Sequence, residues 1–237
     1  MSIETKLAVL AIASYFLGSV PFGLIIGRLK GIDPRTAGSG NIGATNVGRL
    51  LGGKYFALVF TLDLLKGLLP MLLAAWLVRH LADNDKPYLM WMLVGAGSIA
   101  GHLFPVYLKF KGGKGVATSA GVLLGLWPFY TLPGLLVVGL FIAVYAITRT
   151  VSIGSIIGAG AFPIVYVLFG VWKQWPVFTT QLPLLIFAIL VAVMIVWKHR
   201  TNIRRLLAGT EHSFRMETQT GEELATETQR HGEEKDS

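Results

Sequence analysis

The chain has 237 residues, of which 53% are hydrophobic and only 14% are charged, and it contains no cysteine. This charged fraction excludes an ordinary soluble surface, where roughly a quarter of residues are charged, and the absence of cysteine excludes disulfides, a thiolate nucleophile and cysteine-ligated metals. The net charge of +8 would suit nucleic acid, but the basic residues flank apolar segments, so we expect no nucleic acid partner.

Apolar segments recur along most of the chain and predict an all-α, polytopic integral membrane protein. A membrane helix needs about 20 apolar residues. We predict about seven transmembrane helices, at residues 5–28, 55–78, 88–108, 115–128, 130–148, 152–171 and 178–198. The fourth segment is short, and if it forms one kinked helix with the fifth, the chain has six spans. The first is not a cleaved signal peptide, because its apolar run is too long and it has no basic start.

Lysine and arginine are distributed unequally between the loops, and this asymmetry predicts the orientation in the membrane. Thirteen of them lie beside the ends of the first, third, fifth and last segments, whereas the opposite side has only Lys6, Arg79, Lys86 and Lys173. We therefore expect the N-terminus outside and the C-terminus in the cytoplasm. An even number of spans would place the basic C-terminal flank on the same side as Lys6 and break this pattern.

The composition changes sharply near residue 209. Residues 1–208 form the predicted membrane domain, whereas residues 209–237 are polar, acidic and poor in apolar side chains. Such a segment cannot bury a hydrophobic core, so we predict a disordered cytoplasmic tail.

The first polar cluster on the cytoplasmic side, residues 38–49, contains Ser39, Asn41, Asn46 and Arg49 among four glycines. Glycine tolerates positive φ and lets a ligand approach the main-chain amides. Arg49 can form a forked pair with a phosphate or a carboxylate. The alternative is a flexible loop between spans, but asparagine and arginine concentrated beside glycines favour a binding site.

The second cluster, residues 101–118, holds a glycine-rich loop around Lys114. Glycine amides and a lysine ammonium can cradle a phosphate. The candidate residues of this loop are Gly112, Gly113, Lys114, Gly115 and Thr118. It is not a Walker A motif, because a glycine rather than serine or threonine follows Lys114. Two roles remain open for His102, a helix-capping hydrogen bond or a place in the site.

Two further clusters follow the fifth and the last apolar segments. Ser152 can cap a helix N-terminus or bind an anion there, and these two roles are compatible. His199 and Asn202 are three residues apart and share one helical face, and a histidine at the membrane boundary can titrate near neutral pH. We expect Arg200 and Arg205 to lie at the membrane interface.

Inside the second apolar segment, Asp63 and Lys66 are also three residues apart. Ionisable side chains are costly within a membrane, so we expect these two to form a structural ion pair that supports the site. The histidines and carboxylates show no spacing typical of metal ligands, and we predict neither a metal nor a cofactor.

The polar clusters resemble one family, the bacterial membrane glycerol-3-phosphate acyltransferases that use acyl phosphate as donor. The matching segments are GSGNIGATNVGR, GHLFPVYLKFKGGKGVAT, TRTVSIGS and HRTNIRR, in this order between the spans. The resemblance covers about residues 1–208 and implies a seven-helix, multi-pass enzyme of the inner membrane with a cytoplasmic active site. It implies that glycerol 3-phosphate becomes 1-acyl-glycerol 3-phosphate (lysophosphatidate) with release of phosphate, in the first step of phospholipid synthesis. A soluble phosphate acyltransferase would supply the acyl phosphate.

The resemblance also implies that the two phosphates are held by Ser39, Arg49, Lys114, His199 and Asn202, with Ser152 as a further polar site residue. We expect the catalytic residues to be Ser39, Lys114 and His199, and the substrate-binding residues to be Arg49, Asn202, Asn41, Asn46, Ser152, Gly112, Gly113, Gly115 and Thr118. No Ser-His-acid arrangement is apparent, so we expect direct transfer without an acyl-enzyme. Two bases remain open, the phosphate of the substrate or His199.

The competing functional class is a small transporter or channel for phosphorylated solutes. Transporters usually bind their substrate near the membrane midplane between inverted repeats. Here the polar clusters gather at one face and no repeat is visible, which favours the enzyme.

Overall fold

The computed structural model of the chain describes residues 2–81 and 88–211, and within these ranges all regular secondary structure is helical. The helices are α1 (Ile3–Ser19), α2 (Phe22–Leu29), α3 (Ala44–Leu51), α4 (Gly53–Leu81), α5 (Tyr88–Leu103), the 3-10 helix η1 (Val106–Leu108), α6 (Val116–Gly125), α7 (Thr131–Thr148), α8 (Val151–Trp172), α9 (Leu182–Lys198) and α10 (Arg200–Leu207). The predicted all-α class is confirmed. Most of the predicted tail lies outside the described residues.

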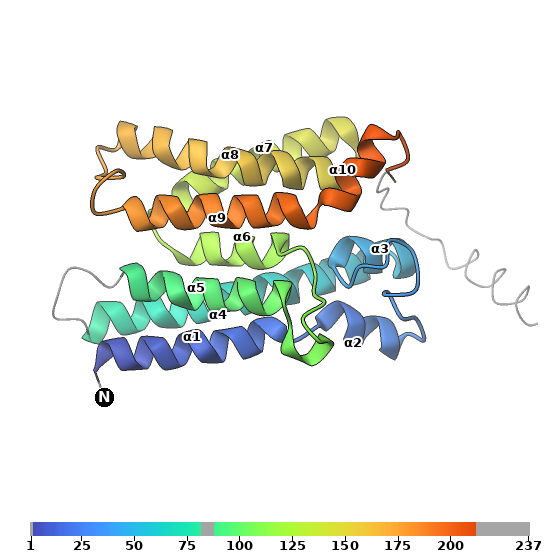
Figure 1. Ribbon diagram of the computed structural model, residues 1–237, viewed down its shortest axis with the longest axis horizontal. Coiled ribbons are helices and arrows are strands. Elements are labelled where there is room, and N and C mark those ends of the chain that lie inside the picture. Colours follow the sequence, from blue (N-terminus) through green and yellow to red (C-terminus); the bar gives the residue numbers. More distant parts are fainter. Residues whose placement is uncertain (1, 82–87, 212–237) are drawn as a thin grey trace, which may run out of the picture.

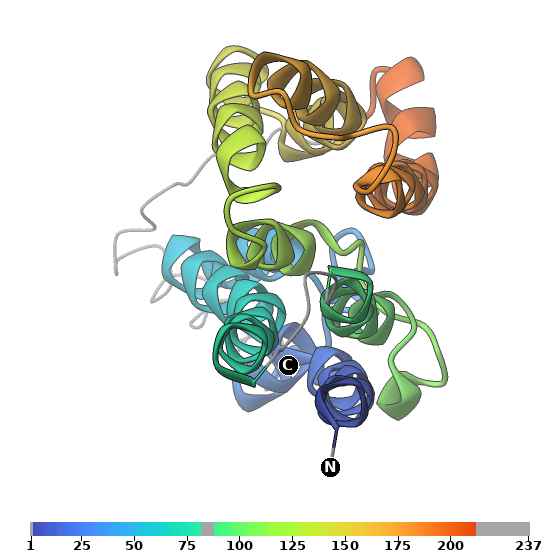
Figure 2. The ribbon, with the colours of Figure 1, turned by 90° about the vertical axis from the view of Figure 1, so that its left-hand side faces the viewer.

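The long helices run side by side in two groups, with the short helix α6 between them. Helices α1, α4 and α5 form one group and helices α7, α8 and α9 the other, as Figure 1 shows from the side and Figure 2 from the end. Large apolar side chains on the outside of both groups are exposed, among them Ile12, Leu136, Ile164 and Leu190. In water this surface would be costly, whereas in lipid it is solvated, which agrees with an integral membrane protein.

Within the described residues, five helical segments are long and apolar enough to cross a membrane, and the pair α9 and α10, bent by 55°, is a sixth candidate. The predicted fourth span, residues 115–128, contains instead the helix α6 of 10 residues. A helix of this length measures about 15 Å, roughly half of the hydrocarbon core. The predicted number of seven spans and the predicted orientation therefore stay predictions.

Helix α6 packs backbone to backbone on α4. A Cβ atom built on Gly67 would lie 2.2 Å from the carbonyl oxygen of Thr118, and one on Gly121 would lie 2.1 Å from that of Leu64. Membrane helices approach this closely where small residues face each other, because helix association in lipid depends on close packing. The contact fixes the start of α6, and with it the glycine-rich loop, against the middle of α4.

The short helices α2, α3 and α10 lie together at one end of the bundle (Figure 1). The glycine-rich loop before α6 and the start of α8 reach the same end. All four polar clusters identified in the sequence belong to these elements, so the fold gathers segments that are far apart in the chain at a single end.

Candidate active site

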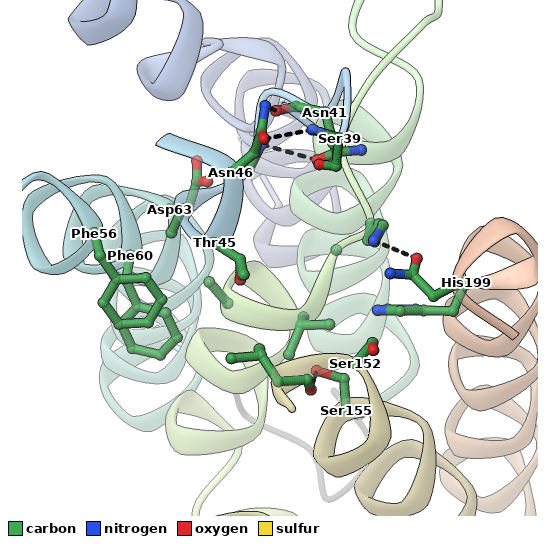
Figure 3. Close-up of a pocket in the computed structure, with 18 of the residues that line it drawn as sticks. Ser39, Asn41, Thr45, Asn46, Phe56, Phe60, Asp63, Ser152, Ser155 and His199 are labelled. Carbon is green, nitrogen blue, oxygen red and sulfur yellow. Dashed lines mark hydrogen bonds between the residues drawn. The ribbon is translucent and has the colours of Figure 1, made fainter. Parts of the chain in front are cut away.

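A polar pocket of about 240 Å³ opens at this end and is lined by all four clusters. Nine of the predicted catalytic and substrate-binding residues line it: Ser39, Asn41, Asn46, Arg49, Lys114, Gly115, Ser152, His199 and Asn202. In Figure 3, Ser39, Asn41 and Asn46 form one wall, the stacked rings of Phe56 and Phe60 form another, and His199 enters from the side opposite the rings. The pocket therefore combines groups that share no local sequence.

The side chain of Asn46 organises the first cluster. Its Oδ1 accepts a hydrogen bond from the Ser39 amide at 2.7 Å, and its Nδ2 donates to three main-chain carbonyl groups of residues 34–41 at 2.9 to 3.1 Å. Gly38 and Gly40, at φ of 59° and 70°, let the loop wrap around this amide. Asn46 is buried and its amide is engaged by the loop. Its contacts therefore hold Ser39 in place, and because Asn46 also lines the pocket, its direct contact with a substrate stays a prediction.

The glycines of the second cluster allow the loop to pack on His102. The amide of Gly113 donates to the His102 carbonyl at 3.1 Å, and Cβ atoms on Gly112 and Gly113 would lie only 2.1 and 2.2 Å from His102 atoms. These two glycines face His102 and are not among the residues that line the pocket, whereas Gly115 is. The imidazole of His102 contacts Gly113 and also lines the pocket, so of its two open roles the geometry favours a place in the site.

Thr118 is fully buried against α4 and likewise does not line the pocket. Its carbonyl is the group that Gly67 approaches, so the residue belongs to the helix contact. Its position predicts a place in the site because a hydroxyl residue follows the glycines in many phosphate loops.

Lys114 is the cation of the loop that reaches the pocket. Its Nζ donates to Oδ1 of Asn202 at 2.5 Å, across 88 residues of sequence. Burial lowers its pKa to about 8, and the positive charges of Arg205 and Arg49 act in the same direction, whereas the carboxylate of Glu211 opposes them. At neutral pH the ammonium is therefore still mainly protonated, and it can meet a phosphate.

His199 stands at the bend between α9 and α10. It is buried, and its Nδ1 lies 2.8 Å from the Ile195 carbonyl oxygen. A carbonyl only accepts, so Nδ1 carries the proton and Nε2 is the nitrogen that can take another one. The 55° bend directs this residue and Asn202 into the pocket together.

The third cluster meets a residue that the sequence argument assigned to the tail. Thr150, not Ser152, is the N-cap of α8, and the Ser152 hydroxyl donates to Oε1 of Glu211 at 2.9 Å. Glu211 also accepts from Asn202 Nδ2 at 2.6 Å and from Arg205 Nε at 2.7 Å. The expectation that Arg205 only anchors at the membrane interface is thus incomplete, because Arg205 also forms an ion pair with Glu211, which lines the pocket.

A sequence signal for Glu211 exists at the end of α10. Gly209 has a φ of +67°, and the Thr210 amide donates to the Arg205 carbonyl at 2.8 Å. A glycine after a helix commonly reverses the chain in this way. Glu211 directly follows the reversal, so its side chain returns toward the basic helix it has just left.

Asp63 and Lys66 pair within α4 as the spacing suggested. Lys66 Nζ lies 2.8 Å from Asp63 Oδ1 and also donates to the Val20 carbonyl at 3.1 Å. Both side chains are buried, at 2% and 5% exposed. Nδ1 of His102 lies 3.7 Å from the same Asp63 oxygen, and both Asp63 and His102 line the pocket.

An apolar cavity of about 360 Å³ continues from the polar pocket between the two helix groups. It is lined by residues of helices α4 to α9, and it shares Phe60, Val116, Phe141 and Ser155 with the polar pocket. A ligand with a charged head and an apolar tail matches this shape, because each part meets the surroundings it prefers.

Across residues 2–81 and 88–211, no group of three or more histidine, aspartate or glutamate side chains could hold a metal ion. The prediction that the protein needs neither a metal nor a cofactor stays a prediction.

Comparisons with known proteins agree on one family. The sequence profile of the glycerol-3-phosphate acyltransferases matches residues 8–209. A relative from Trichlorobacter lovleyi with that name is 46% identical over 203 residues, which are 85% of this chain and 94% of the relative. The crystal structure of PlsY (YgiH), an integral membrane glycerol 3-phosphate acyltransferase, in its glycerol 3-phosphate form has a TM-score of 0.74 and 40% identity over 89% of this chain and 96% of that one. Its lysophosphatidic acid form has a TM-score of 0.71, 39% identity and the same coverage.

Proposed function

Because the chain belongs to the glycerol-3-phosphate acyltransferase family, we propose that it transfers an acyl group from acyl phosphate to the hydroxyl of glycerol 3-phosphate. The products are 1-acyl-glycerol 3-phosphate and inorganic phosphate. A soluble phosphate acyltransferase supplies the donor, and the reaction takes place on the cytoplasmic side of the bacterial inner membrane, as the first step of phospholipid synthesis.

The observation that carries this proposal is the junction of the cationic pocket with the apolar cavity. Lys114 and Arg49 supply positive charge on the polar side, where the phosphates of both substrates would lie. The acyl chain would extend past Phe60 and Phe141 between the helix groups. The reacting carbonyl of the acyl phosphate then lies at the junction, within reach of the hydroxyl of glycerol 3-phosphate.

Acyl phosphate suits this pocket as a donor because it is a mixed anhydride whose leaving group is phosphate. Lys114 and Arg49 stabilise the negative charge that develops on the leaving phosphate and on the carbonyl oxygen. Holding the glycerol hydroxyl against the activated carbonyl replaces an encounter in solution with a positioned reaction. Ser39, held by Asn46, completes the wall on which the glycerol phosphate would lie.

We propose that the transfer is direct. The Nδ1–H of His199 meets a main-chain carbonyl rather than a carboxylate, so the Ser-His-acid relay that activates a nucleophilic serine is not assembled around His199. Nε2 of His199 remains a candidate base for the glycerol hydroxyl, and the phosphate of glycerol 3-phosphate is the other candidate. His199→Gln separates the two. If turnover falls to background while glycerol 3-phosphate still binds, the base is His199.

The test of the function uses purified full-length protein in detergent with palmitoyl phosphate and glycerol 3-phosphate. We expect phosphate release that depends on glycerol 3-phosphate, with one lysophosphatidate formed for each phosphate. Palmitoyl-CoA in place of palmitoyl phosphate should give no product. Phosphate release without lysophosphatidate, or turnover with palmitoyl-CoA, would contradict the proposed donor, and no turnover with either donor would contradict the proposed activity.

A further inference from the structure

The carboxylate of Glu211 is bound by two predicted substrate-binding residues and one arginine. Oε1 accepts from the Ser152 hydroxyl at 2.9 Å and from Asn202 Nδ2 at 2.6 Å, and Oε2 accepts from Arg205 Nε at 2.7 Å. Its side chain is 3% exposed. Although burial alone would raise its pKa, the hydrogen bonds from Arg205, Asn202 and Ser152 hold the pKa below its usual range, so the group stays ionised.

This carboxylate determines which way the Asn202 amide points. An ionised carboxylate only accepts hydrogen bonds, so the Asn202 NH₂ must face Glu211 and its carbonyl oxygen must face the other way. The other direction is that of Lys114, whose Nζ lies 2.5 Å from Asn202 Oδ1. With the amide reversed, an NH₂ group would face the ammonium, which is unfavourable. Glu211 therefore holds Lys114 in place through Asn202.

We propose that Glu211 is a positioning residue of the active site, which orients Ser152 and Asn202 and, through Asn202, the ammonium of Lys114. The proposal rests on the proposed function for the identity of the substrates. It adds to that function a residue that lies beyond α10 and two positions past the region matched by the family profile.

Glu211 also contributes charge to Lys114. The cations around this ammonium are Arg49 from α3 and Arg205 from α10, and the pocket is further lined by Asp63 from α4, His102 from α5 and His199 from the bend before α10. Burial and the two arginines lower the pKa of Lys114, and Glu211 raises it. Removing this carboxylate should therefore make Lys114 lose its proton at a lower pH.

The alternative role for a carboxylate at this place is competition with the substrate phosphate for Ser152 and Asn202. The two roles predict opposite effects of removing the carboxylate on the reaction with glycerol 3-phosphate. If Glu211 positions the site, its removal weakens catalysis. If Glu211 competes with phosphate, its removal lowers the KM for glycerol 3-phosphate.

The test compares Glu211→Gln, which keeps the size and removes the charge, with Glu211→Asp, which keeps the charge and shortens the reach. In Glu211→Gln we expect kcat/KM for glycerol 3-phosphate to fall about tenfold to a hundredfold, as for a small misplacement of catalytic groups. We also expect the alkaline limb of the pH profile, the fall of kcat/KM as Lys114 loses its proton, to move to lower pH. In Glu211→Asp we expect a smaller fall and an alkaline limb close to that of the parent protein. Glu217→Gln, which removes the next acidic residue along the chain, should behave as the parent protein.

A rise in kcat/KM or a lower KM in Glu211→Gln would overturn the positioning role in favour of competition. An unchanged alkaline limb would overturn it as well. If Glu211→Gln does not fold, Glu211→Asp decides, since an unchanged kcat/KM in that variant contradicts a role that depends on reach.

The protonation of Lys114 can also be read without turnover, from the pH dependence of its acetylation by acetic anhydride, followed by mass spectrometry. In Glu211→Gln the midpoint should move to lower pH, and an identical midpoint would overturn the proposal. If the parent protein shows no turnover, the proposed function fails on its own, while this measurement still decides whether Glu211 acts on Lys114.

Discussion

The two carboxylates that line the polar pocket are held in opposite ways. Asp63 lies inside the long helix α4 and pairs with Lys66 on the next turn of the same helix, where lipid and apolar side chains surround the bundle. Glu211 lies beyond α10, and its partners include Ser152, which is 59 residues away in sequence. One pair is local and buried in the bundle, and the other joins distant segments at the polar end.

The difference shows which charged group can tune the site and which can only support it. A charge inside an apolar bundle needs a nearby partner of opposite sign, because leaving it alone there is very costly. A charge at the polar end can bind residues that also face the substrate, as Glu211 binds Ser152 and Asn202. We therefore assign structural support to the Asp63–Lys66 pair and control of the site to Glu211.

The largest effect should follow from breaking the buried pair. Asp63→Ala leaves the Lys66 ammonium buried without its carboxylate, and the expected loss of stability is about 3–5 kcal/mol. Thermal unfolding in detergent measures it. A double variant with leucine at both positions removes both charges and should recover most of the loss. A single variant as stable as the parent would contradict the structural role.

At the polar end, the largest effect should come from Lys114. Lys114→Ala removes the cation that faces the phosphates, and we expect kcat/KM for glycerol 3-phosphate to fall by about 10²–10³, as for the loss of one electrostatic stabiliser. The melting temperature should stay close to that of the parent. Lys111→Ala is the matched control, because Lys111 belongs to the same loop, is exposed and does not line the pocket. Equal losses in both variants would mean that the loop acts by charge alone.

The pH dependence should report the same residue with a smaller effect. Lys114 is protonated below its pKa of about 8 and loses its charge as the pH rises through that value, so kcat/KM should fall above about pH 8 by roughly tenfold per pH unit. Bound phosphate favours the ammonium, so the limb of kcat should lie at higher pH than that of kcat/KM. Lys114→Arg, whose side chain does not titrate in this range, should remove the limb. A limb that persists in this variant belongs to another group.

The smallest effect should come from the apolar cavity, which touches neither charged cluster. Gly158 lines this cavity, whereas Gly160 on the same helix faces open space. Gly158→Val should lower turnover of the longest acyl phosphates by about tenfold relative to shorter ones, because one or two methylene groups lose their room. Gly160→Val should leave the chain-length profile unchanged. Competition between acyl phosphates of different length measures both, and an unchanged profile in Gly158→Val would place the chain elsewhere.

The all-α membrane class, and the nine predicted residues that line the pocket, could be predicted because their signals are local. Apolar runs long enough for a membrane mark the long helices, and glycine, asparagine and basic residues concentrated between them mark the four clusters. The i, i+3 spacing of Asp63 and Lys66 places them on one helical face, and the structure pairs them. The short helix α6 was harder to predict, because its apolar composition matches that of a span and only its length differs.

The sequence by itself determined that the chain is helical and lipid-embedded, and it identified the residues with which a phosphate site could be built. Only the tertiary structure decided which of them meet. It placed Gly112 and Gly113 against His102 and Thr118 against α4, engaged the Asn46 amide in hydrogen bonds with its own loop, and brought Glu211 back from the expected tail into the site. The physical reason is that backbone contacts and hydrogen bonds between distant segments depend on how the helices pack, and a local pattern holds no record of that packing.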